Sequence, residues 1–200
     1  MAATRMPDER PRCWWSEGDK PDPAMLTYHD EEWGTPETDD AELFERLSLE
    51  AFQAGLSWST ILHKRKGFRT AFKGFKPKVV AAFGPADRER LLGDAGIVRN
   101  GAKIDATIRN AQIALELIRE FGSLDAYFRS MLPPAKPVPP RTRPGMLPDS
   151  TPDAEALSAD LRKRGMRFVG PTVVYSFMQS VGLVDDHLPN CFRYRGERVA

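Results

Sequence analysis

Apolar residues recur at helical spacing along most of the chain, with polar residues between them. In the stretch DDAELFERLSLEAF, the apolar side chains fall on one face of a helix that begins at a capping Asp39. Gly55 ends this pattern, and Ser57 can cap a second helix in SWSTILHKRKGF. We therefore expect two consecutive helices joined by a short turn over residues 39–68.

Capping residues and apolar spacing predict further helices along the rest of the chain. Pro77 opens one helix, Ser123 caps another, and Thr151 followed by Pro152 starts one that stops at Gly165. The segments are 76–83, 85–96, 101–122, 123–132, 150–165 and 170–184, and the last is apolar enough to be the most buried. The sequence contains no run of alternating polar and apolar residues, which would mark a strand. The expected fold class is all-α.

The chain is expected to form one folded domain behind a loose N-terminal tail. Residues 1–11 are polar and contain proline, which favours disorder at a terminus, whereas residues 12–200 carry the helical patterns. Within this domain, residues 133–150 are rich in proline, which excludes a continuous helix and predicts a surface loop. A length of 200 residues with 41% hydrophobic residues fits a single domain that buries a sizeable core.

Composition excludes several classes of protein. The net charge of +1 does not decide between partners, because a basic face can be balanced by acidic residues elsewhere. The N-terminal residues lack the apolar core of a signal peptide, and no apolar run is long enough to cross a bilayer. Two cysteines in a chain of this length fit a reducing compartment. We therefore expect a cytoplasmic protein that does not bind membranes.

Both cysteines and two of the three histidines lie near the ends of the chain. Cys13 and His29 occur in RCWW and LTYHDEEWG, and His187 and Cys191 occur in HLPNC. Two thiolates and two imidazoles complete a tetrahedral zinc site, which would join the two ends and leave no open position for a substrate. The spacing also permits a Cys13–Cys191 disulfide, or two buried thiols beside two ordinary histidines.

An acidic residue among apolar neighbours is the second candidate for chemistry. Glu50 lies in LEAFQAGLSW near the end of the first expected helix, and Trp58 follows the turn. A carboxylate beside an indole in a cleft can bind an extruded base and stack on it. Alternatively, Glu50 is a surface charge and Trp58 a core residue. Trp15, Tyr28 and Trp33 add aromatic faces that suit a flat cation but also fill a core.

The stretch LLGDAGIVRNGAKIDATIRNA predicts two helices joined by a short turn. Gly96 lies in this turn and Ile97 is its apolar anchor, so their backbone N–H groups could face a DNA phosphate. Arg99 and Lys103 add positive charge beside it. The same pattern also describes an ordinary helical hairpin without a ligand. Basic runs at residues 63–66 and 162–164 could contact phosphates, although such runs are common at solvated helix ends.

Together, these blocks resemble the bacterial 3-methyladenine DNA glycosylase I family. RCWW, YHDEEWGTPETDD, LEAFQAGLSW, DAGIVRNGAKI, KRGMRFVGPTVVYSFMQSVGLVDDH and HLPNC occur in the family's order between residues 12 and 191. Three segments depart from its pattern: a longer stretch between Cys13 and Tyr28, residues 133–148 and residues 63–66. The resemblance implies the helix–hairpin–helix glycosylase fold. It also implies one structural zinc per chain, bound by Cys13, His29, His187 and Cys191.

The same resemblance implies a pocket and an activity. Glu50, Tyr28, Trp58 and Trp15 would line the pocket for an extruded base. The implied reaction, by a monomeric enzyme, is hydrolysis of the N-glycosidic bond of 3-methyladenine in double-stranded DNA, leaving an abasic site. Methylation at N3 makes the base cationic, so it departs as a neutral molecule. A non-catalytic, zinc-containing module that binds damaged DNA is the alternative, and a helical scaffold held by a disulfide is a third interpretation.

Overall fold

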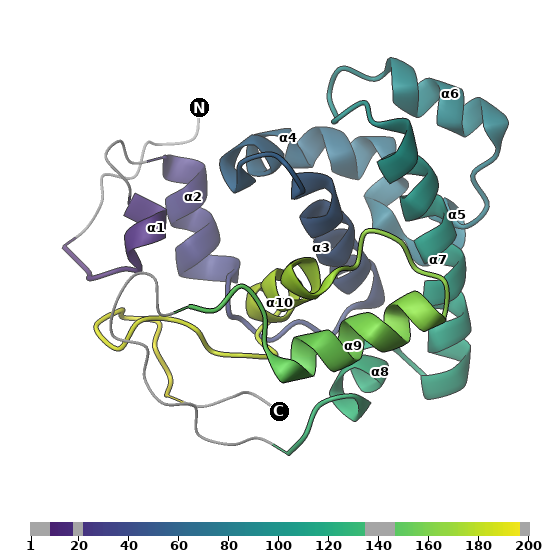
Figure 1. Cartoon of the computed structure of the whole chain (residues 1–200). Coiled ribbons are helices and arrows are strands. Elements are labelled where there is room, and N and C mark those ends of the chain that lie inside the picture. The colour runs from purple at the N-terminus through teal and green to yellow at the C-terminus, as the bar shows by residue number, and fades with distance from the viewer. Residues whose placement is uncertain (1–8, 18–21, 135–146, 197–200) are drawn as a thin grey trace. The chain divides into compact units, whose positions relative to one another are not determined.

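A computed structural model of the protein describes residues 9–17, 22–134 and 147–196 (Figure 1). None of these residues is in a β-strand, so the expected all-α class is confirmed for the described part of the chain. Within the same ranges, no helix has the length and apolar character that crossing a membrane requires. Residues 1–8 of the expected tail and residues 135–146 of the proline-rich segment lie outside the described residues.

Internal contacts divide the chain into two compact units, each built from segments that are far apart in the sequence. Helix α10 (Pro171–Ser180) runs from the second unit into the first. The first unit comprises Met1–Pro36, Pro134–Pro148 and Met178–Ala200, and the second unit comprises Glu37–Pro133 and Asp149–Phe177.

Short helices form the N-terminal part of the first unit. They are α1 (Trp14–Glu17), α2 (Pro23–Thr27) and the π-helix η1 (Tyr28–Glu32). Their lengths of four or five residues are too short for a helical period to show, which explains why the sequence pattern did not predict them.

Part of the expected tail contacts the folded first unit. Phe192 N donates a hydrogen bond to Pro11 O at 2.9 Å. The guanidinium carbon of Arg10 lies 4.2 Å from the centre of the Phe192 ring, a cation–π contact. Residues 10 and 11 therefore belong to the folded unit rather than to a loose tail.

The remaining helices belong to the second unit, and local capping explains where several of them begin. Asp39, Ser57, Ser123 and Thr151 each accept backbone N–H groups from the first turn of a helix, as the sequence predicts. The elements are α3 (Asp40–Gln53), α4 (Trp58–Ala71), η2 (Lys73–Phe75), α5 (Pro77–Val80), α6 (Pro85–Gly93), α7 (Gly101–Phe121), α8 (Leu124–Ser130) and α9 (Pro152–Lys163).

The core of the second unit lies around α7 and an aromatic cluster. Helix α7 packs against α3, α5, α6 and α8, and it buries Ile104, Ala111 and Leu117 completely. Between α3 and α4, the ring centres of Phe52 and Phe68 are 4.7 Å apart, which is a usual distance for an aromatic pair. This packing holds the C-terminal end of α3 in place, where Glu50 lies.

A close approach of two glycines fixes the turn between α6 and α7 against α4. A Cβ atom on Gly67 would lie only 2.4 Å from Gly96 O, so position 67 has no room for a side chain. Lys64 Nζ donates to Ala95 O at 2.9 Å in the same turn. The turn is therefore tied to α4 on one side.

Candidate active site and metal centre

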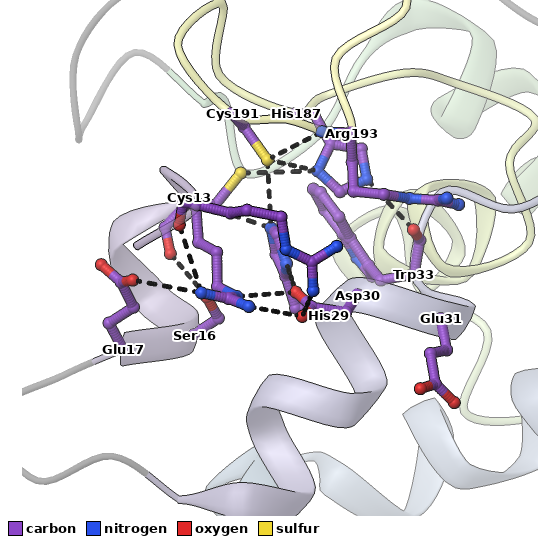
Figure 2. Close-up of polar contacts among 12 residues, drawn as sticks. Cys13, Ser16, Glu17, His29, Asp30, Glu31, Trp33, His187, Cys191 and Arg193 are labelled. Carbon is purple, nitrogen blue, oxygen red and sulfur yellow. Dashed lines mark hydrogen bonds and ion pairs between the residues drawn. The ribbon is translucent and has the colours of Figure 1, made fainter. Parts of the chain in front are cut away.

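Four side chains from distant segments of the first unit meet in a buried cluster (Figure 2). Cys13 lies just before α1 and His29 in η1, while His187 and Cys191 follow α10. Their ligand atoms all lie within 4.8 Å of one another, and all four residues are buried. The structure thus brings together the four residues that the sequence singled out.

The distances within this cluster match those around a tetrahedral ion. His187 Nδ1 lies 3.5 Å from both Cys13 Sγ and Cys191 Sγ, and His29 Nε2 lies 3.4 Å from Cys191 Sγ. Zinc bonded to sulfur and nitrogen at its usual lengths would hold those atoms about 3.6 Å apart in a tetrahedron. The donor set and its spacing therefore fit a closed Cys2His2 metal site.

Contacts outside the cluster fix which nitrogen of each imidazole faces inward. His29 Nδ1 lies 2.9 Å from Asp30 Oδ1, so this N–H donates outward and Nε2 points to the sulfurs. His187 Nε2 lies 3.1 Å from Trp33 O, which leaves Nδ1 for the cluster. Partners of this kind orient a metal-binding imidazole and make it more basic.

A buried arginine holds Asp30. Arg12 Nε donates to Asp30 Oδ1 at 2.8 Å, and Arg12 Nη2 donates to Asp30 Oδ2 at 2.7 Å. This two-point pairing fixes the plane of the carboxylate as well as its position. The chain of contacts from Arg12 through Asp30 to His29 therefore links the segment before α1 to η1 and ends at the cluster.

The two sulfurs are set up as ligands rather than as a disulfide. Cys13 and Cys191 are free thiols. Leu188 N donates to Cys13 Sγ and Arg193 N donates to Cys191 Sγ, each at 3.4 Å. A hydrogen bond between the thiols lowers the pKa of Cys191 and raises that of Cys13. The backbone N–H donors at both sulfurs would stabilise the thiolates that metal ligation requires.

Gly34 provides the space that His187 needs. Its φ of +74° lies in the left-handed region, and a Cβ atom would meet His187 Nε2 at 2.8 Å. The preceding residue, Trp33, supplies the carbonyl that accepts from the same nitrogen. Glycine is therefore required here both for the backbone conformation and for the approach of the imidazole.

Aromatic rings surround this cluster on the N-terminal side. The ring centre of Trp15 lies 5.3 Å from His29, 5.0 Å from Trp33 and 6.3 Å from Tyr28. The adjacent Trp14 is 51% exposed, so of the two neighbouring tryptophans Trp15 is the one that packs here. Tyr28 is buried and directly precedes a candidate ligand, so a metal at His29 would also fix the position of Tyr28.

A cavity of about 190 Å³ lies in the second unit at the C-terminal end of α3. The end of α3, the loop that follows it and the first two turns of α10 form its walls. The lining residues are Glu50, Gln53, Ala54, Gly55, Leu56, Thr172, Val173 and Ser176.

Glu50 is the acidic residue of this cavity, and it is only 6% exposed. Among the described residues, none donates a hydrogen bond to its carboxyl group. Burial raises the pKa of Glu50 to about 8, against a partial opposing effect of the Arg46 charge. A buried carboxyl group facing a cavity without a donor is a common feature of ligand sites, because the ligand supplies the missing partner.

Trp58 and Glu50 come from consecutive helices. Trp58 is the first residue of α4, directly after the capping Ser57, and it is half-buried. The walls of the cavity include the neighbouring Leu56, which is 42% exposed, but not Trp58. The expected pairing of Trp58 with the carboxylate in one pocket therefore stays a prediction.

Hydrogen-bond donors in and after the turn between α6 and α7 already have acceptors within the protein. Gly96 N donates to Asp94 Oδ1 at 2.7 Å, and Ile97 is a buried anchor, as expected. Lys103 Nζ donates to Phe52 O at 2.8 Å and to Ala54 O at 2.7 Å.

These contacts correct the expectation that Lys103 faces a DNA phosphate. Its side chain is only 7% exposed and satisfies the free carbonyl groups at the end of α3. The Asp94 carboxylate already occupies the amide of Gly96, so an anion would meet a negative charge there. Arg99 is exposed and remains open to contact.

Comparison with known proteins decides the family. A family profile described as methyladenine glycosylase matches residues 15–194. The chain belongs to this family. The Escherichia coli K12 protein named DNA-3-methyladenine glycosylase 1 is 44% identical over 187 residues, which cover 94% of this chain and 98% of the relative. A Haemophilus influenzae protein named DNA-3-methyladenine glycosylase is 43% identical over 183 residues, which cover 90% of this chain and 96% of the relative.

Solved members of the methyladenine glycosylase family share the fold of this chain. A 3-methyladenine DNA glycosylase I from Staphylococcus aureus, solved to explain its recognition of 3-methyladenine, superposes with a TM-score of 0.82 at 36% identity. The match covers 87% of this chain and 93% of that one. Another 3-methyladenine DNA glycosylase I superposes with a TM-score of 0.83 at 43% identity, covering 92% of this chain and all of the other.

The sequence analysis did not identify several of the residues that line the Glu50 cavity. Thr172 and Ser176 lie four residues apart on α10 and therefore share one face of the helix. Two polar positions at this spacing within the apolar run PTVVYSFM are a signal that could have identified them. Leu56 gave a similar signal, because it is an apolar side chain inside a turn between Gly55 and Ser57.

Proposed function

We propose that the protein is a DNA-3-methyladenine glycosylase that hydrolyses the N-glycosidic bond of 3-methyladenine in double-stranded DNA and leaves an abasic site. The observation that supports this best is Glu50, a buried carboxyl group without a hydrogen-bond donor among the described residues, in a cavity with room for one flat ligand. Family membership supplies the class of ligand. A base methylated at N3 is cationic and offers both the charge and the N–H groups that this carboxyl group lacks.

The chemistry requires little proton transfer from the protein. When the bond between C1′ and the base breaks, its electron pair returns to the cationic ring, and the base leaves neutral. Water adds to C1′ of the sugar cation and loses its proton to solvent. Glu50 is largely protonated before a base binds, since burial raises its pKa to about 8. A cationic base beside it lowers that pKa, so the carboxylate forms against the charged base, accepts hydrogen bonds from its edge and selects it over normal adenine. Extrusion of the base costs a few kcal/mol, which contacts to the base and to the DNA backbone offset.

Tyr28, Trp15 and Trp58 are the proposed aromatic contacts of the extruded base. An aromatic face attracts a cation by about 0.5–2 kcal/mol, which adds to the selectivity for a charged base. The packing of Trp15 beside Tyr28 supports this assignment, with ring centres 6.3 Å apart. In the sequence, Trp15 lies two residues after the candidate ligand Cys13, and Tyr28 directly precedes the candidate ligand His29.

We further propose that Cys13, His29, His187 and Cys191 bind one zinc ion per chain. Two thiolates and two imidazoles complete the coordination of zinc, so the bound ion would supply cross-linking and no catalytic chemistry. The spacing of the donors and the outward hydrogen bonds of both imidazoles support this ligand set.

Contacts to the DNA backbone are proposed at two turns. The first is the turn between α6 and α7, where the backbone at Gly96 and Ile97 and the exposed Arg99 could contact a phosphate. The Asp94 carboxylate makes this turn less favourable, because it already accepts from the Gly96 amide. The second is the turn between α9 and α10, and the structure favours it. Its exposed Arg167 is positive, and α10 starts after it and lines the cavity at Thr172 and Val173. A phosphate beside the extruded nucleotide would meet the N-terminal end of α10.

The proposal includes a monomeric enzyme whose residues 12–200 act as one domain in the cytoplasm. The competing proposal is a zinc-containing module that binds damaged DNA without cutting the glycosidic bond. Nothing in such a module requires a buried acidic group in a cavity, and a buried carboxyl group without a donor weakens the fold. Glu50 therefore favours the enzyme.

Base release from methylated duplex DNA tests the function. The released bases are separated by chromatography for the wild type and for Glu50→Ala. We expect release of 3-methyladenine by the wild type and a loss of at least tenfold in the variant, since Glu50 carries the recognition of charge. Binding of methylated DNA by folded, metal-loaded protein without release of any base would favour the binding module.

A further inference from the structure

The turn between α9 and α10 contains a strained residue. Phe168 has a φ of +55°, in the left-handed region that bulky L-residues avoid. Residues held there persist only where the surrounding structure enforces the conformation, and they are common at functional sites. Among the described residues other than glycine, only Lys73 and Phe75 share a positive φ.

Burial explains the strain at Phe75 but not at Phe168. Phe75 has a φ of +50° and is completely buried, with its ring stacked 5.1 Å from that of Phe72. Its conformation therefore places an aromatic ring in the core. Phe168 is 38% exposed and is one of the few large apolar side chains of the described chain that face solvent. Here the strained conformation points a ring outward, where it gains much less from burial.

Buried polar side chains enforce this conformation from both sides. Arg167 N donates to Asn110 Oδ1 and Asn110 Nδ2 donates to Arg167 O, both at 2.9 Å. On the other side, Ser158 Oγ donates to Val169 O at 2.7 Å. Asn110 belongs to α7 and Ser158 to α9, and both are buried. The two residues that flank Phe168 are thus each fixed to a helix.

The position of this turn relates it to the cavity around Glu50. Helix α10 begins at Pro171 (Figure 1). Its residues Thr172 and Val173 line that cavity. Arg167 next to the strained residue is exposed and positive. The exposed cation and the exposed aromatic ring thus lie five and four residues before Thr172, which lines the cavity of the unpartnered Glu50 carboxyl group. Duplex DNA around an extruded base offers matching chemistry, with exposed sugar and base edges beside phosphates.

We propose that Phe168 is a DNA-contacting residue and that Asn110 is the positioning residue that presents it. The Phe168 ring packs on the sugar and base edge of the strand beside the extruded nucleotide. The two hydrogen bonds of Asn110 to Arg167 hold the turn in this conformation before DNA binds. This inference rests on the proposed glycosylase function and adds a contact and its support to it.

Replacement of Phe168 by glycine tests the contact. Glycine adopts positive φ without strain, so Phe168→Gly should fold at least as well as the wild type. We expect its KM for methylated duplex DNA to rise about tenfold, because the variant loses one stacking contact. Its affinity for free 3-methyladenine should not change. The matched control is Val79→Ala, which shortens a similarly exposed apolar residue on α5. A wild-type KM in Phe168→Gly would overturn the proposal.

Asn110 requires a readout that a general structural role would not produce. In Asn110→Asp, the carboxylate still accepts from Arg167 N but no longer donates to Arg167 O. We expect a higher KM for DNA, an unchanged affinity for free 3-methyladenine, and faster hydrogen exchange at Arg167 N. Asn110→Asp combined with Phe168→Gly should be no worse than Phe168→Gly alone, because both act on one contact. Parallel loss of free-base binding would instead show a general disturbance of the fold and would overturn the positioning role.

Failure of this inference differs from failure of the proposed function. A wild-type protein that releases no methylated base contradicts the function, whatever the variants do. A wild-type protein that releases 3-methyladenine, with Phe168→Gly equally active at low DNA concentration, contradicts only the inference.

Discussion

The Cys2His2 cluster of the first unit and the Glu50 cavity of the second unit differ in how their buried polar groups find hydrogen-bond partners. Both imidazoles of the cluster have an outward partner, and both sulfurs accept backbone N–H groups. Glu50 has no donor among the described residues. A fully satisfied buried network rigidifies a fold, whereas an unsatisfied acidic group weakens it and awaits a ligand. The contrast supports the proposal that the cluster stabilises the fold and that the cavity binds a ligand.

Removal of a ligand from the metal cluster should have the largest effect. In Cys191→Ser, the zinc content of purified protein should fall from about one equivalent per chain to near zero, and the protein should unfold at a much lower temperature. Structural zinc sites contribute about 10–16 kcal/mol at neutral pH in small zinc-dependent folds, which sets an upper bound here.

The third histidine is the matched control for this change. His63 is exposed on α4, and its Nδ1 lies 2.8 Å from Ser59 O on the same helix. It is not part of the Cys2His2 cluster. His63→Gln should keep the metal and the stability of the wild type. A Cys191→Ser protein that retains one equivalent of zinc would contradict the ligand assignment.

Replacement of Glu50 should change stability in the opposite direction. The pKa of Glu50 is raised from 4.5 to about 8, so between these values the folded protein holds a proton that the unfolded chain releases. Below about pH 4.5 the burial of Glu50 therefore costs no charge-related stability, and the free energy of unfolding falls as the pH rises from there towards 8. Each unit of pKa shift corresponds to about 1.4 kcal/mol, so Glu50→Gln should be more stable than the wild type by a few kcal/mol at pH 9.

Thermal unfolding at two pH values measures this gain. Well below pH 4.5 the wild-type Glu50 is neutral in both states, so the difference between the proteins should become small. The same variant should release base more slowly at every pH. A stability gain that is equal at both pH values would show that burial of a charge is not its cause.

Loss of the contact between Asp30 and His29 should weaken metal binding without abolishing it. Asp30→Asn removes the negative charge that makes His29 a better donor and breaks the two-point pairing with Arg12. Substitution of such outer partners lowers metal affinity about 10–100-fold. Competition with a coloured chelator measures the affinity directly. Glu31→Gln on the same π-helix is the control and should bind metal like the wild type; equal affinity in both variants would contradict the role of Asp30.

Local features were predictable from the sequence, and distant partners were not. The caps at Asp39, Ser57 and Thr151 depend on residues within three positions, and all three are confirmed. Lys103 was assigned wrongly because its partners, the carbonyls of Phe52 and Ala54, lie about fifty residues away. No local pattern reports such a contact.

The turns illustrate the same limit. Asp94 two residues before Gly96 is a common turn motif, so its hydrogen bond to the Gly96 amide could have been foreseen. The positive φ of Phe168 could not, because it depends on Asn110 in another helix. The family resemblance grouped the four proposed metal ligands, while their spacing alone left a disulfide and ordinary side chains as alternatives.

Shortening Leu56 should have the smallest effect on the glycosylase reaction. This residue is 42% exposed at the edge of the Glu50 cavity, and it follows Gly55 in the loop after α3. Apolar side chains at such positions fill the gap that an extruded base leaves in a duplex. Leu56→Ala should therefore lower kcat/KM for methylated duplex DNA several-fold, while the activity on methylated single-stranded DNA, which has no stacked gap to fill, stays the same. The ratio of the two activities isolates this role from a general loss of pocket structure. Equal losses on both substrates would show that Leu56 acts only as a wall of the pocket and does not fill the gap in the duplex.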